Sequence, residues 1–426
     1  MSATAVLNDE AQRLVGEIGQ ADLVVGIPSF NNASTIGHVA AAAAMGLAKY
    51  FPDRVAVLVN SDGGSSDGTP EVVARLEPGP ARTLLLRHAM RPVRKLVTAY
   101  QGIPGKGSAF RTIFEIARRL DARACAVVDA DLRSVTPEWF ELLLGPVLQE
   151  GYEFVAPLYS RHKYDGTITN AIVYPLVRSL YGKRIRQPIG GDFGMSGKLA
   201  AHYADQDAWH SDVARFGIDI WMTTTALVGG FRVCQAYLGA KIHDAKDPGA
   251  HLANMLVQVT GSLFAQIEAH EAYWSKITGS EAVPEFGFRY HVGLEPVNVN
   301  LERMRNAFRN GVREFAPLYA EFLEPDTRAR LQAIAQASDT TFALPADLWV
   351  RVVYEFVLAF HARRPHPDHL LRTLTPLYLG RTASWVCEAA DYSADDVENA
   401  LDDLSRRFED TKPAFLRAWQ EGRFLS

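Results

Sequence analysis

Residues 124–150 read ACAVVDADLRSVTPEWFELLLGPVLQE, and this order of residues is typical of a strand-to-helix unit in an α/β protein. The first five residues are apolar, as in a parallel strand that helices cover on both faces. Two aspartates, Asp129 and Asp131, follow the strand, and a helical pattern begins at Pro137. The unit therefore predicts a buried strand with two carboxylates at its carboxyl end.

The same alternation extends over the first 160 residues. Short apolar runs, which predict further strands, occupy residues 23–27, 55–59 and 154–158. Patterns long enough for crossover helices lie at residues 35–50 and 107–120. The order of these segments predicts an α/β fold with an open, doubly wound sheet.

Helical patterns dominate the chain after about residue 244. We therefore expect an α/β domain over residues 1–250 and a helical region over residues 251–426. The periodic segments of the second region are 252–267, 297–319, 348–361 and 394–419. Because proline disrupts helical hydrogen bonding, we expect the helices to be separated by Pro345, Pro365, Pro367 and Pro376.

The composition excludes several classes of protein. The chain has 426 residues, of which 48% are hydrophobic and 22% charged, a balance typical of globular enzymes and not of fibres or disordered chains. Its 44 Lys and Arg and 49 Asp and Glu give a net charge of −5, so no global positive field is present to bind nucleic acid. The Ala-rich residues 39–48 are too short to span a membrane.

The cysteines and the N-terminal residues indicate a cytoplasmic protein. Cys125, Cys234 and Cys387 are too widely separated in the sequence for a disulfide framework or a zinc site. Residues 1–20 carry acidic side chains and lack the basic and apolar regions of a signal peptide. We therefore expect a reducing, cytoplasmic location.

Polar turns follow the predicted strands, and in open α/β sheets ligands bind at this edge. Asp129 and Asp131 are separated by one residue beyond a strand, and alternate residues of an extended chain point in the same direction. Both carboxylates are therefore able to contact one cation or one sugar phosphate. The alternative is a helix cap or a solvated turn before Pro137. The turn of residues 28–32 and the Asp62 loop of residues 61–69 follow two earlier strands, and Asp62 either binds a base or ribose or is a simple loop former.

A second group of motifs indicates anion binding and acid chemistry. Lys106 lies between Gly105 and Gly107 before a predicted helix, which suits a phosphate, although a flexible turn has the same composition. The motif is not a Walker loop, because Gly107 replaces the required Ser or Thr. Asp192 and Asp219 each follow glycine-containing turns and are either acids of a binding site or parts of structural turns. His243 is either an ordinary histidine or a metal ligand beside Asp131.

The order of these motifs resembles that of the GT-A glycosyltransferases. More narrowly, the chain resembles the retaining group that contains mannosylglycerate synthase and glucosyl-3-phosphoglycerate synthase. The resemblance covers residues 22 to 270, and its most specific motifs are residues 104–107 (PGKG), 187–192 (QPIGGD) and 217–219 (GID). It implies a GT-A catalytic domain, with a doubly wound, Rossmann-like mixed sheet, over residues 1–250. The helical region, residues 251–426, is expected to cover the acceptor site, to form a homodimer interface, or both.

The resemblance also implies roles for individual residues. Asp131 and His243 would bind Mg²⁺ or Mn²⁺, and Lys106 would contact the donor diphosphate or groups on the base side. Asp192 would lie beside the donor sugar, and Asp219 would lie near the acceptor and the reacting centre. The acceptor carboxylate would be bound by Arg161 and Thr169, a guanidinium and a hydroxyl that suit it. The remaining nucleotide-sugar contacts would come from Pro28, Ser29, Asn31, Asp62, Gly105, Asp129 and Ala130.

Two departures from the family pattern leave the base and sugar open. Asp192 stands where these relatives commonly carry Glu, and residues 30–32 lack the acid often found in the first loop. The resemblance implies a metal-dependent, retaining transfer of glucose or mannose from a nucleotide sugar, such as GDP-mannose, GDP-glucose or UDP-glucose. The acceptor would be D-glycerate, 3-phosphoglycerate or a similar hydroxy acid, as in compatible-solute synthesis.

Two other functions remain as alternatives. A sugar-phosphate nucleotidyltransferase also uses a doubly wound sheet, a lysine and paired aspartates, but its glycine-rich signature lies in the first strand-to-helix turn, and residues 28–32 contain no glycine. A non-catalytic sensor would bind a nucleotide sugar without turnover. Such a sensor has little need of a metal beside the leaving group.

Overall fold

The computed structural model describes residues 6–76, 94–99, 105–209, 213, 217–242, 252–290, 294 and 297–422. The chain forms two compact units. The first comprises residues 1–160, 187–244 and 283–294, and the second comprises residues 161–186, 245–282 and 295–426. Residues 161–186 thus group with the helical unit, whereas the prediction from sequence used one boundary after residue 250.

The first unit is built on an eight-stranded mixed sheet with the order β10-β8-β5-β7-β4-β1-β2-β3. β7 is antiparallel to β4 and β5, while the other neighbouring pairs are parallel. The strands are β1 Leu23–Ser29, β2 Ala56–Asp62, β3 Arg94–Ala99, β4 Ala124–Val127, β5 Phe154–Ser160, β7 Phe193–Ser196, β8 Val233–Ala240 and β10 Glu285–Phe286.

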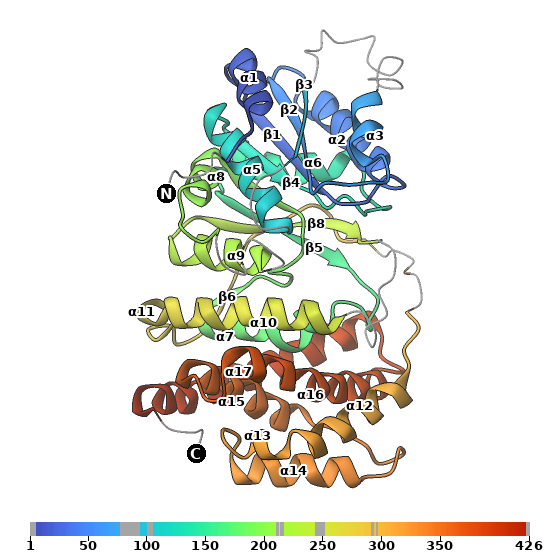
Figure 1. The fold of residues 1–426 in the computed structure, drawn as a ribbon, viewed down its shortest axis with the longest axis vertical. Coiled ribbons are helices and arrows are strands. Elements are labelled where there is room, and N and C mark those ends of the chain that lie inside the picture. Colours follow the sequence, from blue (N-terminus) through green and yellow to red (C-terminus); the bar gives the residue numbers. More distant parts are fainter. Residues whose placement is uncertain are drawn as a thin grey trace. The chain divides into compact units, whose positions relative to one another are not determined.

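Helices cover both faces of this sheet. α2, α3 and α6 lie on one face, and α5 and α8 lie on the other (Figure 1). Alanines of α2 and large apolar residues of α6 pack with β1, β2 and β4 in one continuous buried cluster. The helices of the unit are α1 Asp9–Ile18, α2 Ile36–Tyr50, α3 Thr69–Arg75, α5 Lys106–Arg119, α6 Pro137–Glu150, α8 Gly197–Ala204 and α9 Ile218–Val228.

The predicted α/β architecture is confirmed, and so is the helical C-terminal region. β1, β2, β4 and β5 overlap the predicted apolar runs, and all seven residues of β1 and of β2 are buried. The sequence analysis had not identified β3 or the short antiparallel strand β7. The apolar part of β7 is only four residues long, too short for a pattern to stand out.

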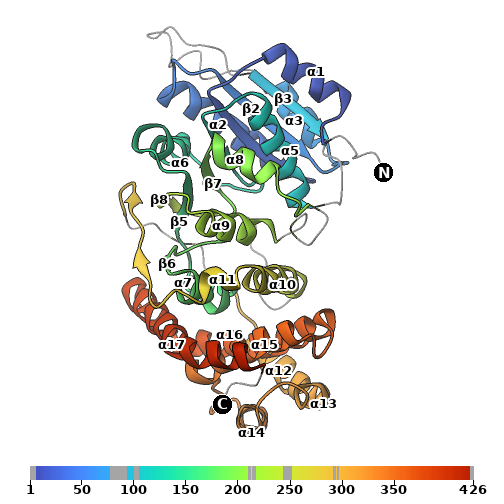
Figure 2. The same ribbon diagram turned by 90° about the vertical axis from the view of Figure 1, so that its left-hand side faces the viewer.

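The second unit consists mainly of helices in three layers. In Figure 2, α15, α16 and α17 form the middle layer, with α7, α10 and α11 on one side and α12, α13 and α14 on the other. The π-helical turn η1, Thr169–Val173, leads directly into α7. The elements are α7 Tyr174–Tyr181, β6 Lys183–Arg184, α10 Leu252–Ala269, α11 Glu271–Trp274, β9 Glu281–Ala282, α12 Leu301–Glu314, α13 Ala316–Tyr319, α14 Pro325–Gln336, α15 Ala346–Ala362, α16 Pro367–Glu388 and α17 Ala394–Glu421.

One helix boundary was predicted wrongly. Pro376 does not end a helix but lies inside α16. A Cβ added to Gly311 of α12 would lie 2.3 Å from the Pro376 Cβ, so the two helices approach each other closely at this point. Packing of the buried proline against α12 therefore compensates for the lost backbone hydrogen bond. The expectation that proline ends a helix considers only neighbouring residues in the sequence and does not include such packing.

Within the described part of the chain, no helix is both long and apolar enough to cross a membrane.

A buried glutamate joins two helices of the second unit. The Glu355 carboxylate, on α15, accepts hydrogen bonds from Thr327 Oγ1 at 2.8 Å and from the backbone N–H of Glu324 at 3.2 Å. Glu324 is the N-cap residue of α14, so Glu355 satisfies a backbone donor at the start of that helix. Burial raises the pKa of Glu355 to about 7, and the hydrogen bonds from Thr327 and Glu324 only partly oppose this shift.

We predict that Glu355 makes the unfolding free energy fall as the pH rises from about 4.5 to about 7. The reason is that the Glu355 carboxyl group loses its proton at a lower pH in the unfolded chain than in the folded chain. The decrease should approach about 3 kcal/mol, and Glu355→Gln should abolish it. Denaturant unfolding across this pH range tests the prediction, with the exposed Glu321→Gln as control. An unchanged pH dependence in Glu355→Gln would contradict it.

Candidate functional site

The sheet topology brings four strand ends to one edge. β4, β5 and β8 run in the same direction, so Asp129, Tyr159 and Lys241 lie at their carboxyl ends. β7 runs in the opposite direction and therefore begins at this edge, directly after Asp192. Residues that are more than a hundred positions apart in the sequence are thereby placed side by side, at the edge where α/β sheets bind ligands.

At this edge, acidic and basic side chains alternate in one continuous chain of ion pairs, which we call the ion chain. Its order is Asp219, Lys106, Asp129, Lys241 and Asp192. Lys106 Nζ lies 3.2 Å from Asp219 Oδ1 and 2.7 Å from Asp129 Oδ1. Lys241 Nζ lies 2.9 Å from Asp129 Oδ2 and 2.8 Å from Asp192 Oδ2. Asp129 therefore has a lysine on each of its two oxygens.

Burial and pairing act against each other on these groups. Burial disfavours the ammonium of Lys106, but Asp129 and Asp219 outweigh this effect and raise the pKa of Lys106. Burial also opposes ionisation of Asp129, but Lys106 and Lys241 together lower its pKa. For Asp192 and Asp219, burial has the largest effect and raises the pKa of each carboxyl group.

Lys106 is the first residue of α5, where the helix dipole disfavours a positive charge. Two carboxylates hold it there, and its ammonium also lies 5.1 Å from the centre of the Phe110 ring. A cation at this position is suited to an anionic ligand at the sheet edge.

Asp192 is fully buried, in contrast to the other acids of the ion chain. Its Oδ1 accepts the backbone N–H of Asp129 at 2.7 Å, and its Oδ2 accepts the Tyr159 hydroxyl as well as Lys241. All of these contacts come from donors, which is the pattern of an ionised carboxylate. The predicted contact of Asp192 with a donor sugar stays a prediction, because in the structure both oxygens face other protein groups.

The turn before Asp192 requires glycine. Gly191 has φ +91°, and a Cβ there would lie 2.2 Å from Asp129 Oδ2 and 2.9 Å from Lys241 Nζ. Only glycine tolerates both the backbone conformation and the approach of the Asp129 carboxylate.

The Asp62 carboxylate shapes its own loop. It is buried and accepts hydrogen bonds from the Ser29 hydroxyl at 2.9 Å, the Ser65 hydroxyl at 2.6 Å, and the backbone N–H groups of Gly64 and Ser65, both at 2.8 Å. Ser29 and Asp62, which were both predicted to bind the nucleotide, are thus brought together at the ends of β1 and β2. Pro28 precedes Ser29 within β1.

The loops after β1 and β2 are interlocked beyond Asp62. Asn31 donates its backbone N–H to Ser65 Oγ at 2.8 Å, and its side-chain oxygen accepts the Ser66 N–H at 3.0 Å. Asp67 accepts the backbone N–H of Ala33 at 2.9 Å. Asn31 has a left-handed φ of 54°, a conformation that asparagine tolerates better than most residues.

Asp131 is the candidate metal ligand that the structure describes. It is partly exposed, and no hydrogen bond or ion pair joins its carboxylate to another described residue. A carboxylate oxygen that has no protein partner fits Mg²⁺ or Mn²⁺, which proteins often bind through one or two carboxylates together with phosphate oxygens and water. His243 lies outside the described residues, and the described part of the chain contains no cluster of three His, Cys, Asp or Glu arranged to hold a metal.

The turn that links Asp129 to Asp131 is held by a hydrogen bond. The Thr35 hydroxyl donates to the backbone oxygen of Ala130 at 2.7 Å.

The predicted acceptor residues Arg161 and Thr169 belong to the second unit. There, Arg161 pairs with Asp165 at 3.4 Å, and Thr169 is buried at the start of η1.

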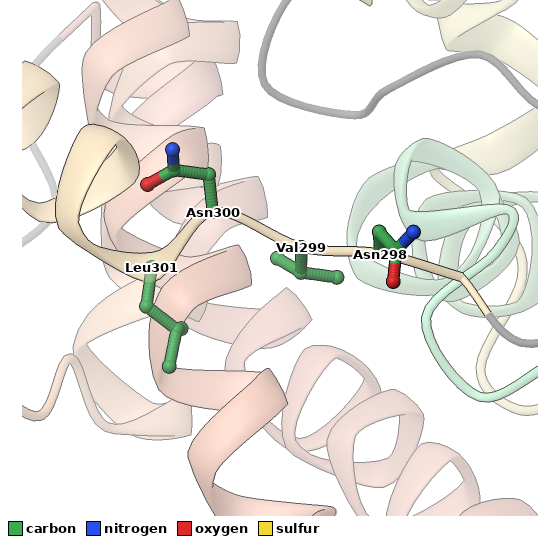
Figure 3. Close-up of a pocket in the computed structure, with 4 residues that line it drawn as sticks. All are labelled: Asn298, Val299, Asn300 and Leu301. Carbon is green, nitrogen blue, oxygen red and sulfur yellow. The ribbon is translucent and has the colours of Figure 1, made fainter.

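The structure also contains a pocket at the start of α12. Figure 3 shows its described lining residues, Asn298, Val299, Asn300 and Leu301. None of these four side chains is ionisable, and none of the four is a residue that we predicted to be functional.

Comparisons with known proteins give matches only at the level of structure. No family model matches the chain, and no curated protein matches it. A structure of glucosyl-3-phosphoglycerate synthase from Mycobacterium tuberculosis with Mn²⁺, uridine diphosphate and glucosyl-3-phosphoglycerate matches with a TM-score of 0.42 and 20% identity, covering 59% of this chain and 83% of that chain. Another, with phosphoglyceric acid, matches with a TM-score of 0.41 and 19% identity, covering 59% and 83%. This enzyme is one of the two that the sequence resemblance names.

The structure identifies site residues that the sequence analysis missed. Lys241 and Tyr159 both contact Asp192, and Ser65 and Asp67 join the two loops. Lys241 is the first residue after β8 and Asp129 is the second residue after β4, and this similar position after a strand was the signal available in the sequence.

We predict that Gly191→Ala lowers the unfolding free energy by about 1 to 3 kcal/mol, because the left-handed conformation becomes strained and the Asp129 carboxylate must move. Denaturant unfolding measures this change. The control is Gly16→Ala in α1, where nothing lies within 4 Å of the added Cβ. Equal stability of Gly191→Ala and the native chain would contradict the geometry described here.

Proposed function

We propose that this chain is a metal-dependent glycosyltransferase that moves glucose or mannose from a nucleotide-diphospho-sugar to D-glycerate, 3-phosphoglycerate or a similar small hydroxy acid, with retention of configuration. The observation that carries the proposal is the position of Lys106. Its ammonium bridges Asp129 and Asp219 at the carboxyl edge of the sheet. Asp129 is two positions before Asp131, whose carboxylate has no ion pair or hydrogen bond to a described residue. The order of the motifs supplies the substrate class.

The donor would be bound by the edge formed by β1, β2 and β4. The interlocked loops that contain Asn31 and Asp62 would hold the base and ribose, and Lys106 would contact the diphosphate. Asp131 and His243 would hold Mg²⁺ or Mn²⁺, which when bound neutralises charge on the departing nucleoside diphosphate. Fixed charges at this position stabilise the leaving group without reorganisation during the reaction.

Asp219 would act on the acceptor side of the same edge. Asp219 is held by Lys106, and burial raises its pKa. Its carboxyl group is therefore suited to orient the hydroxyl group of the acceptor or to share the proton of that hydroxyl group. Arg161 and Thr169 would bind the acceptor carboxylate. In a front-side reaction the leaving phosphate oxygen takes the acceptor proton, and no enzyme nucleophile is needed. The cytoplasmic location and the homodimer remain predictions from the sequence.

A matrix of donors and acceptors tests this function directly. UDP-glucose, GDP-glucose and GDP-mannose are each combined with D-glycerate, 3-phosphoglycerate or no acceptor, with Mg²⁺ or Mn²⁺. We expect release of nucleoside diphosphate only when an acceptor is present, with a product mass equal to acceptor plus hexose. Release of pyrophosphate from a nucleoside triphosphate and a sugar phosphate would indicate the nucleotidyltransferase instead, and binding without release would indicate a sensor.

We predict that Asp131→Asn lowers metal-dependent turnover at least about 100-fold without changing the melting temperature, because it removes a ligand and no hydrogen bond or ion pair to a described residue. Steady-state rates over a Mn²⁺ titration measure the effect. The matched control is Asp205→Asn, an exposed aspartate at the end of α8 in the same unit. Native turnover by Asp131→Asn would remove the metal assignment.

A further inference from the structure

We propose that Lys241 is a positioning residue that fixes Asp129 for the reaction. The inference rests on the proposed function, because it assigns a role within the same site. Lys241 directly follows β8, and its side chain is only 4% exposed. Its ammonium lies 5.2 Å from the centre of the Tyr159 ring, so it occupies the interior of the sheet edge and not the surface.

The contacts of Lys241 match the capacity of its ammonium group. An ammonium has three N–H donors, and among the described residues three acceptors lie around Nζ: Asp129 Oδ2 at 2.9 Å, Asp192 Oδ2 at 2.8 Å and the backbone oxygen of Gly190 at 2.7 Å. The Lys106 side chain, in contrast, is 17% exposed. One oxygen of Asp129 thus contacts the buried ammonium of Lys241, and the other contacts the more accessible ammonium of Lys106.

Lys241, Asp192 and Asp129 form a closed ring of hydrogen bonds. Lys241 donates to both carboxylates, and Asp192 in turn accepts the backbone N–H of Asp129 at 2.7 Å. Both the backbone and the side chain of Asp129 are therefore fixed by the same pair of buried residues. Displacement of a positioned charge by about 1 Å is enough to reduce a reaction rate strongly. Lys241 thus acts through Asp129, and Asp192 belongs to the same positioning device.

Two variants test this role. Lys241→Met removes the ammonium but leaves the buried Asp192 without its cation, which endangers folding. The double variant Asp192→Asn with Lys241→Met removes one positive and one negative charge together, so it separates positioning from simple charge balance. The control is Lys198→Met, since the Lys198 side chain is 75% exposed and pairs with Glu153 at 3.0 Å in the same unit.

We expect kcat of both Lys241 variants to fall at least about 100-fold while KM for the donor changes less than about threefold, because a misplaced charge affects the transition state more than binding. Lys198→Met should retain the native kcat. Native kcat in the double variant would overturn the proposal, since Lys241 would then only balance the charge of Asp192. A KM for the donor that rises as much as kcat falls would also overturn it, since Lys241 would then bind the donor.

A crystal structure of the double variant tests the positioning without any activity. We expect the Asp129 carboxylate to move by more than about 0.5 Å, the tolerance of a preorganised site. An unmoved carboxylate would overturn the role of Lys241 whether or not the chain transfers a sugar. Absence of sugar transfer by the native chain would overturn the proposed function alone.

Discussion

The carboxylate of Asp129 forms ion pairs with two lysines, Lys106 and Lys241, that come from distant parts of the α/β unit's sequence. A single carboxylate between two ammonium groups remains ionised even when it is largely removed from water, because each cation offsets part of the desolvation cost. The outer acids, Asp192 and Asp219, compensate the remaining positive charge of the lysines. Two lysines and three aspartates thus bring the buried charges of the ion chain close to balance.

The mixed sheet makes this arrangement feasible. If β7 were parallel to its neighbours, its first residue would lie at the opposite edge, and Asp192 would not reach the backbone of Asp129. The one antiparallel strand therefore adds an acid to an edge at which parallel strands already end. Fold and site are linked here by strand direction, and not by neighbourhood in the sequence.

The sequence predicted the elements whose signals are local. The strand before Asp129 and the helix after it were confirmed because an uninterrupted apolar run precedes the aspartates and a regular helical pattern follows them, and Lys106, Asp192 and Asp219 were singled out by their glycine-rich motifs. Lys241 was missed because its importance depends on which strands lie beside β8, and a single sequence does not show strand order. Pro376 was misjudged for a similar reason, since its partner in α12 is distant along the chain.

The interlocked loops after β1 and β2 have a consequence for evolution and design. Because Asn31 and Asp67 each bond across to the other loop, a substitution or a length change in one loop alters the backbone of the other. Tolerated substitutions in these loops would therefore arise in pairs, and related sequences should show covariation between residues 30–33 and residues 65–67. A library that varies both segments together would sample folded loops far more often than one that varies either segment alone.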